Sequence, residues 1–294
     1  MANDVLDFIK GAKRCFDGAT GTMLMRLGMK VGECPEMVDE AIMEQVHNAY
    51  ITAGAQFITT NTFGGSRPKL AKFGLGDRVT EINRRNAAIA KRTATGRGVY
   101  VAGDIGPTGE FIQPYGDFTK GQFEEVFSEQ AKALAEGGAD LIIIETMSAI
   151  EELTAAIRAV KSSTTLPVIA CMTFDKTPNG YRTMMGITPQ QAVGAMHESG
   201  ADVVGTNCTL TPPEIVDLAK ELRSLTERPI LAQPNAGQPH LVDGKTTYAP
   251  IPNLEESLRQ IIQAGTDIVG GCCGTDPEYI RLLRSLIDEA NTRT

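Results

Sequence analysis

The sequence contains 294 residues, of which 42% are hydrophobic and 22% are charged, and its 28 basic and 36 acidic side chains give a net charge of −8. This balance argues against nucleic acid and anionic membranes as partners. The N-terminal segment is acidic where a secretory signal is basic, and no apolar run approaches the ~18 residues of a membrane helix, so we expect a cytoplasmic protein.

Eight short apolar segments alternate with segments of helical periodicity. In chain order they are RCFDGATG, AGAQFITTNT, VYVAGDIG, GGADLIIIET, PVIACMTF, SGADVVGTNC, PILAQPN and AGTDIVGGCC. Four of them open on a small residue and a glycine, the pattern of a helix end before a buried strand. Thr119 and Thr188 are predicted helix N-caps. The alternation predicts a single (β/α)8 TIM barrel domain over residues 1–294, with an open doubly wound sheet as the competing architecture.

Two of the expected strand-to-helix connections are unusually long. They cover residues 107–118 and 236–253, and both are rich in glycine and proline. Active sites of barrel enzymes are built from such connections at the carboxyl ends of the strands. Both segments are therefore predicted to form walls of a site.

The predicted carboxyl ends of the strands are polar and rich in thiols. They carry Asp17, Asn61, Asp104, Glu145, Asn207, Cys208, Asn235, Cys272 and Cys273. In a closed barrel these ends share one mouth, so side chains far apart in the sequence become neighbours.

Three of the six cysteines lie at these ends. Cys208, Cys272 and Cys273 suit a tetrahedral zinc whose fourth position is open to substrate. Two other interpretations stay open at this point, since no C-x-x-C spacing is present: the three are small buried hydrophobic residues, or Cys272 and Cys273 form a redox pair. Cys15 and Cys171 lie inside apolar runs and are expected in the core.

Asp17 and Glu145 are predicted to need a cationic partner, because an unpaired buried carboxylate is costly. A substrate ammonium or a framework lysine or arginine would supply it. Asn61, Asn207 and Asn235 either contact substrate or tie loop backbones together. The sequence contains no dinucleotide or Walker motif, so no nucleotide is expected.

The motifs FDGATGT, TNTFGGSRPKL, GDIGPTGE, IIIET, GTNCTLTPPE, PNAGQP and GGCCGTDPEYI, taken together and in this order, resemble the homocysteine S-methyltransferase family. Within it, the sequence is most similar to the homocysteine-binding domain of cobalamin-dependent methionine synthases. The resemblance implies a (β/α)8 barrel and zinc held by Cys208, Cys272 and Cys273.

The resemblance also implies how homocysteine is held. Its amino group is expected near Asp17 and Glu145, and its carboxylate at the backbone from Gly18 to Thr20. Asn235 matches a family asparagine that is expected to approach zinc when substrate is absent. The implied activity is methyl transfer to the homocysteine thiolate, which yields methionine.

The methyl donor is expected to be methylcobalamin or another methylcorrinoid on a separate protein or module, because the chain stops at Thr294, just past the last barrel helix. S-methylmethionine is the second candidate. Betaine is the third, because a quaternary ammonium calls for an aromatic cage and the sequence has no tryptophan and only 6 tyrosines. A zinc-dependent thiol-binding module without catalysis of its own is the alternative from another class.

Overall fold

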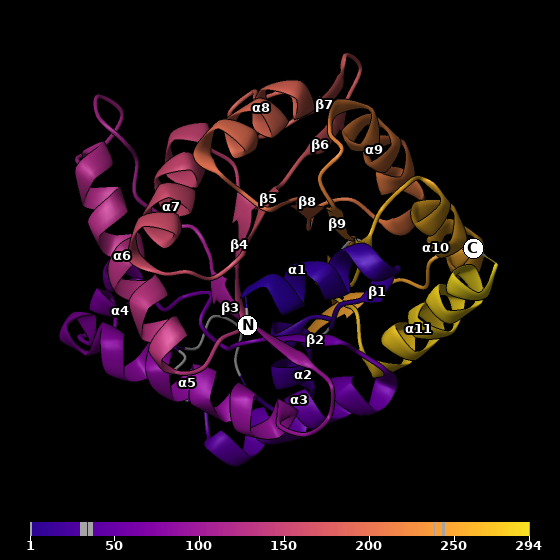
Figure 1. The fold of residues 1–294 in the computed structure, drawn as a ribbon, viewed down its shortest axis with the longest axis horizontal. Coiled ribbons are helices and arrows are strands. Elements are labelled where there is room, and N and C mark those ends of the chain that lie inside the picture. Colours follow the sequence, from indigo (N-terminus) through magenta and orange to yellow (C-terminus); the bar gives the residue numbers. More distant parts are fainter. Residues whose placement is uncertain (1, 30–33, 35–37, 238, 243–244, 294) are drawn as a thin grey trace.

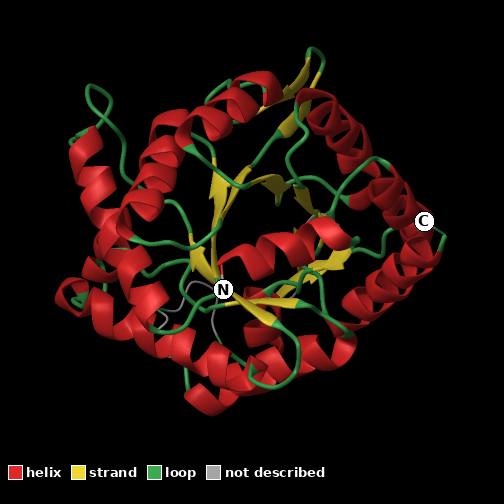
Figure 2. Cartoon of the chain, in the orientation of Figure 1, coloured by secondary structure: helices red, strands yellow, loops and turns green. Residues whose placement is uncertain are grey.

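The computed structural model describes residues 2–29, 34, 38–237, 239–242 and 245–293. Among them, a parallel sheet of eight strands forms the centre of the molecule (Figures 1 and 2). Its strands are β1 (Arg14–Cys15), β2 (Phe57–Thr59), β3 (Tyr100–Ile105), β4 (Leu141–Met147), β5 (Val168–Met172), β8 (Val203–Asn207), β9 (Ile230–Gln233) and β12 (Ile268–Val269). Neighbours follow the order β1-β12-β9-β8-β5-β4-β3-β2. The N–H of Gln56, just before β2, donates to the carbonyl of Cys15 in β1 at 2.8 Å and joins the two ends of this order.

Helices surround the strands as an outer ring (Figure 1). The helices are α1 (Ala2–Gly11), α2 (Thr20–Arg26), α3 (Glu40–Ala53), α4 (Arg67–Ala71), the 3-10 turn η2 (Gly76–Arg78), α5 (Val79–Ala94), α6 (Lys120–Glu136), α7 (Ile150–Ser163), α8 (Pro189–Ser199), α9 (Pro212–Leu225), α10 (Leu254–Gln263) and α11 (Pro277–Thr292). The alternation of strand and helix confirms the predicted (β/α)8 TIM barrel.

Local sequence signals start and stop these helices. Thr119 and Thr188 each form a capping box with the glutamine three residues later. The threonine hydroxyl accepts from the backbone N–H of that glutamine, and the glutamine side chain accepts from the backbone N–H of the threonine. Gly54 and Gly200 end α3 and α8 in the left-handed conformation that favours glycine. These expectations from the sequence are confirmed.

The barrel interior is filled by side chains that alternate along the strands. Phe16, Phe57, Ile143 and Ile169 belong to this cluster, and each is completely buried. Helix α1 lies across the amino-terminal end of the barrel, and its Val5 and Ile9 pack into the same cluster (Figure 1). One end of the barrel is thus closed by a helix, and chemistry is left to the carboxyl ends of the strands.

Two antiparallel hairpins interrupt the βα alternation, and the sequence patterns did not predict either. The first pairs β6 (Asp175–Thr177) with β7 (Gly180–Arg182) after β5. The second pairs β10 (Pro239–Val242) with β11 (Lys245–Tyr248) after β9. Both lie in connections that follow carboxyl ends of barrel strands, so both belong to the mouth side of the barrel.

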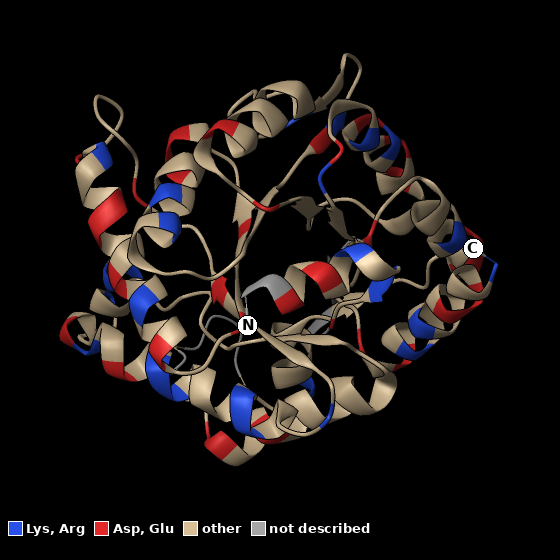
Figure 3. Cartoon of the chain, viewed as in Figure 1, with Lys and Arg blue, Asp and Glu red and all other residues tan. Residues whose placement is uncertain are grey.

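Charges of both signs are interspersed over the ring of helices (Figure 3). Arg92 on α5 pairs with Glu44 on α3 at 2.6 Å, and Lys161 on α7 pairs with Asp202 before β8 at 3.0 Å. No helix among the described residues is long and apolar enough to cross a membrane.

Candidate functional site

Three thiols converge at the carboxyl ends of β8 and β12. The sulfur atoms of Cys208, Cys272 and Cys273 all lie within 4.8 Å of one another, and the Sγ atoms of Cys208 and Cys273 are 3.8 Å apart. Two sulfurs at corners of a tetrahedral zinc, each about 2.3 Å from the metal, are separated by about 3.8 Å. The donor set and its spacing therefore fit zinc.

The end of β9 and the segment that follows it hold the three cysteines in place. The N–H of Cys208 donates to the Gln233 carbonyl at 3.0 Å, and the N–H of Cys272 donates to the Pro234 carbonyl at 2.8 Å. The N–H of Ala236 donates to the carbonyl of Cys273, also at 2.8 Å. Because these bonds use the backbone, the thiols remain available to a ligand.

Unusual backbone conformations aim these side chains. Cys208 has a φ of 65° and Thr209 has a φ of 48°, both in the left-handed region that non-glycine residues rarely adopt. Gly271 has no room for a side chain, because a Cβ there would meet Thr275 Oγ1 at 2.5 Å. Strain of this kind costs on the order of 1–3 kcal/mol per residue and is concentrated at functional sites.

The three thiols cannot all ionise without a cation. Hydrogen bonds from the Cys272 and Cys273 thiols lower the pKa of Cys208 to about 3. The same contact with Cys208 raises the pKa of Cys273 to about 12, and the pKa of Cys272 also rises. Ionisation of one thiol therefore opposes ionisation of the other two, and a divalent cation would be needed to ionise all three.

The thiols form one end of a cavity of about 430 Å³. Its lining residues are Gly18, Ala19, Thr20, Gly21, Thr22, Leu24, Met25, Met29, Thr59, Thr60, Asn61, Thr62, Phe63, Asp104, Glu145, Thr146, Cys208, Gln233, Tyr248, Gly271, Cys272 and Cys273. Two of them, Asp104 and Glu145, are carboxylic acids, and none of these lining residues is a lysine, arginine or histidine. The cavity thus favours a cationic ligand.

Asp17 follows β1 and is 1% exposed. Thr59 on β2 donates to its carboxylate twice, at 2.7 Å from N to Oδ2 and at 2.8 Å from Oγ1 to Oδ1. Burial nevertheless raises the pKa of Asp17 to about 7, because two hydrogen bonds do not replace the lost hydration.

Glu145 lies near the carboxyl end of β4 and is linked to the thiol cluster by Asn207. The amide of Asn207 donates to Glu145 Oε2 at 3.0 Å and lies 3.8 Å from Cys272 Sγ, while its carbonyl accepts from the Thr146 N–H at 2.8 Å. Burial raises the pKa of Glu145 to about 8, with smaller contributions from the negative charges of Cys208 and Asp17. A bound cation would relieve this repulsion.

A family model described as homocysteine S-methyltransferase matches residues 14–287, which is nearly the whole chain. The chain belongs to the homocysteine S-methyltransferase family. The resemblance drawn from the sequence motifs is confirmed.

Two curated relatives in this family are methionine synthases. The chain is 31% identical over 299 residues to the methionine synthase of Mycobacterium tuberculosis, a match that covers 95% of this chain and 25% of the relative. It is 28% identical to the methionine synthase of Mycobacterium leprae, with 99% and 26% covered. The chain spans about a quarter of the length of these relatives.

The barrel also resembles the solved structure of the homocysteine methyltransferase MmuM from Escherichia coli in its metallated form. The TM-score is 0.79 at 22% identity, and the match covers 96% of this chain and 98% of the other. At this identity the likeness concerns the fold.

In this member of the homocysteine S-methyltransferase family, the other predicted site residues either line the cavity or lie buried beside it. Gly18 and Thr20 line it at the start of α2, where the N–H of Ala19 donates to Thr275 Oγ1 at 3.0 Å. Asn61 lines it too, and its buried Nδ2 has no hydrogen-bond partner among the described residues. Asn207 is completely buried beside the cavity, and Asn235, 4% exposed, contributes to the lowered pKa of Cys208.

Two residues of the cavity wall have no role predicted from the sequence. Asp104 is predicted only to lie at a strand end, and Gln233 is not among the predicted site residues. Gln233 is 4% exposed, and its Oε1 has no hydrogen-bond partner among the described residues. A polar residue at the end of a buried strand was the available signal for both.

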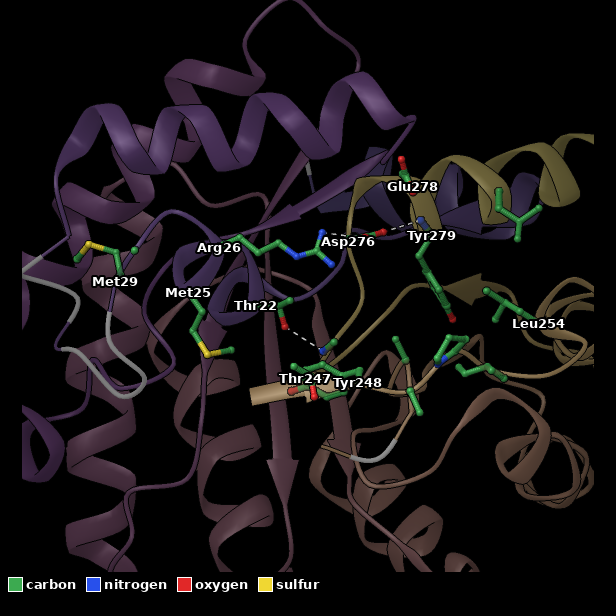
Figure 4. A pocket seen from close by; sticks show the side chains of 17 residues that line it. Thr22, Met25, Arg26, Met29, Thr247, Tyr248, Leu254, Asp276, Glu278 and Tyr279 are labelled. Atoms are coloured by element: carbon green, nitrogen blue, oxygen red, sulfur yellow. Dashed lines mark hydrogen bonds and ion pairs between the residues drawn. The ribbon is translucent and has the colours of Figure 1, made fainter. Parts of the chain in front are cut away.

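A larger groove of about 1280 Å³ lies beside the cavity and shares Thr22, Met25, Met29 and Tyr248 with it. In Figure 4 the Thr22 hydroxyl accepts from the N–H of Gly274, and Arg26 reaches Asp276. The long connection 236–253 supplies Tyr248 to both spaces, which agrees with its prediction as a wall.

The prediction that residues 107–118 form a wall of the site was wrong, because these residues line neither the cavity nor the groove. That segment folds back on itself through a bridge between Ile112 and Phe118.

Proposed function

We propose that residues 1–294 form a zinc-dependent homocysteine-binding barrel domain that transfers a methyl group to the homocysteine thiolate and so forms methionine. One observation carries the proposal. A three-thiol cluster and the carboxyl groups of Asp104 and Glu145 line the same cavity, and no basic side chain is among its lining residues. Homocysteine carries a thiol for the first group and an ammonium for the second.

The residues of the cavity divide the substrate between them. Cys208, Cys272 and Cys273 would hold zinc, which when bound lowers the pKa of a coordinated thiol so that it is a thiolate at neutral pH. Glu145, in the cavity wall, and Asp17, directly before the lining residue Gly18, bind the ammonium and thereby orient the sulfur toward the thiol cluster. Asn207 fixes the Glu145 carboxylate by its 3.0 Å hydrogen bond.

The start of α2 is proposed to receive the substrate carboxylate. Gly18 and Thr20 line the cavity, and α2 begins at Thr20 without a side-chain cap, so backbone N–H groups of its first turn are free for an anion. The carboxylate and the ammonium would then be held by different segments, which fixes the direction in which the sulfur points.

We propose a methylcorrinoid on a separate protein or module as the methyl donor. The similarity to methionine synthases four times longer than this chain supports it. The loops after β3 and β5 also expose apolar side chains on the mouth side, with Tyr115 exposed by 83% and Met184 by 79%, where a protein carrier would approach. S-methylmethionine is the second candidate, because the barrel also resembles a homocysteine methyltransferase that the chain covers over 98% of its length.

A side-by-side donor assay tests the proposal. We expect the zinc-loaded protein to form methionine from homocysteine with methylcobalamin or a methylated corrinoid protein, and little with betaine. Methionine is quantified by chromatography, with zinc-free protein as the control. Faster turnover with S-methylmethionine or betaine would contradict the corrinoid donor but not the thiol acceptor. Binding of homocysteine without turnover on any donor would indicate a thiol-binding module.

Homocysteine binding is expected to release about one proton more than methionine binding at pH 7. A free thiol has a pKa of about 8.5 and is mostly protonated at this pH, whereas a thiol bound by zinc is a thiolate. Methionine presents the same ammonium and carboxylate without a thiol proton and is therefore the control. Calorimetry in buffers of different ionisation enthalpy measures both values, and an identical buffer dependence for the two ligands would contradict the thiolate.

A further inference from the structure

Asp104 lines the cavity, and one oxygen of its carboxyl group has no hydrogen-bond partner in the described part of the chain. It lies on β3, is 5% exposed and lines the cavity with Glu145, while the buried Asp17 directly precedes the lining residue Gly18. Its Oδ1 atom is buried and has no hydrogen-bond partner among the described residues. An unpaired polar atom of this kind is rare in a folded protein and calls for an explanation.

The backbone of Asp104 is held on both sides, so its position is fixed. Its N–H donates to Thr60 Oγ1 at 2.9 Å, and its carbonyl accepts from Thr62 Oγ1 at 2.7 Å. Gln130 donates to the same carbonyl at 3.4 Å. Several polar side chains thus anchor the backbone of a residue whose Oδ1 atom has no partner among the described residues.

The charged groups that act most strongly on Asp104 have the same sign as its own carboxylate. Burial raises its pKa well above the usual range, and the nearby carboxyl groups of Glu145 and Asp17 add to the effect. Asp17 has Thr59 as a partner and Glu145 has Asn207, whereas Oδ1 of Asp104 has none. A ligand with several N–H donors and a positive charge is what this trio lacks.

We propose that Asp104 is the third acceptor of the substrate's primary ammonium group, and that it makes the cavity select an α-amino thiol over the same thiol without the amino group. An ammonium has three N–H donors, one for each of Asp17, Asp104 and Glu145. The inference rests on the proposed function, since it takes homocysteine as the ligand.

The test is a binding cycle with the Asp104→Asn variant of the zinc-loaded protein. Calorimetry measures the affinity for homocysteine and for 4-mercaptobutanoate, which lacks the amino group. We expect homocysteine to bind about tenfold to a hundredfold more weakly to the variant, because a hydrogen bond to a charged group is lost. The affinity for 4-mercaptobutanoate is expected to stay within about twofold.

The Asp140→Asn variant is the matched control. Asp140 precedes β4 at the opposite end of the barrel, where it accepts from the Val101 N–H at 2.9 Å and pairs with Lys91 at 2.6 Å. The control removes the same charge without touching the cavity. Its ratio of the two affinities should equal that of the unmodified protein.

Thermal unfolding without ligand separates a binding role from a structural one. The midpoint for Asp104→Asn should equal or exceed that of the unmodified protein, because the amide removes repulsion from Asp17 and Glu145.

A lowered midpoint together with an equal loss of affinity for both thiols would overturn the inference, as would unchanged homocysteine binding. If the unmodified protein binds 4-mercaptobutanoate as tightly as homocysteine, Asp104 has no selective role, although the thiol site stands. If it binds neither, the proposed function fails and the inference with it.

Discussion

Replacement of both Cys272 and Cys273 by serine is expected to abolish zinc binding and methyl transfer together. The two residues supply two of the three sulfur atoms that lie within 4.8 Å of one another, and serine hydroxyls do not replace thiolates as zinc ligands. Loss of an outer partner of a metal ligand already costs roughly 10–100-fold in metal affinity. Loss of two direct ligands should exceed that, and metal analysis after dialysis measures it.

Cys171→Ala is the control for this double variant. Cys171 is completely buried in the barrel interior and is not part of the three-thiol cluster. Its removal should leave zinc content and turnover per folded protein unchanged. Equimolar zinc retained by the double variant would refute the assignment of these thiols as ligands, provided that thermal unfolding shows both variants to be folded.

The Glu145→Gln variant is expected to bind homocysteine about tenfold to a hundredfold more weakly while it keeps its zinc. The substitution removes the charge that meets the ammonium, and a hydrogen bond to a charged group contributes roughly 1.5–3 kcal/mol. The glutamine Oε1 can still accept from Asn207, so the link to the thiol cluster at 3.0 Å is preserved. Calorimetry and metal analysis on the same preparation measure the two effects.

Glu152→Gln provides the matched control for Glu145. Glu152 is also a buried glutamate, but it accepts from the N–H and hydroxyl of Thr108, at 2.8 and 2.7 Å, and does not line the cavity. Its substitution should leave homocysteine affinity unchanged. Equal affinity of Glu145→Gln and the unmodified protein would assign Glu145 to the framework instead.

The barrel strands and helix ends could be predicted because their signals are local. Parallel strands buried on both faces appear as short apolar runs, and Thr119 and Thr188 each carry a glutamine three residues on that completes a capping box. The position of α1 could not be predicted in this way. Its apolar residues Val5 and Ile9 show that one face is buried, but not that this face closes the end of the barrel.

The candidate site was predicted at the level of strand ends and not at the level of contacts. Position at a carboxyl end brought Cys208, Cys272 and Cys273 together, because a closed barrel makes those ends neighbours. The isolation of the Asp104 carboxyl depends on what every surrounding strand places beside it, which no local pattern contains. Loop length was also a poor guide, since residues 107–118 fold onto themselves and not over the cavity.

The strands that supply the carboxyl groups and the strands that supply the thiols occupy two separate arcs of the barrel. The two carboxyl groups of the cavity wall come from β3 and β4, the nearby Asp17 follows β1, and the three thiols follow β8 and β12. Substitutions in the first arc can therefore alter which cationic group is accepted without disturbing the sulfur cluster, and substitutions in the second can alter the metal without disturbing the acids. Relatives with this barrel could therefore differ in substrate through substitutions in β1 to β4 and still keep the three-thiol cluster unchanged.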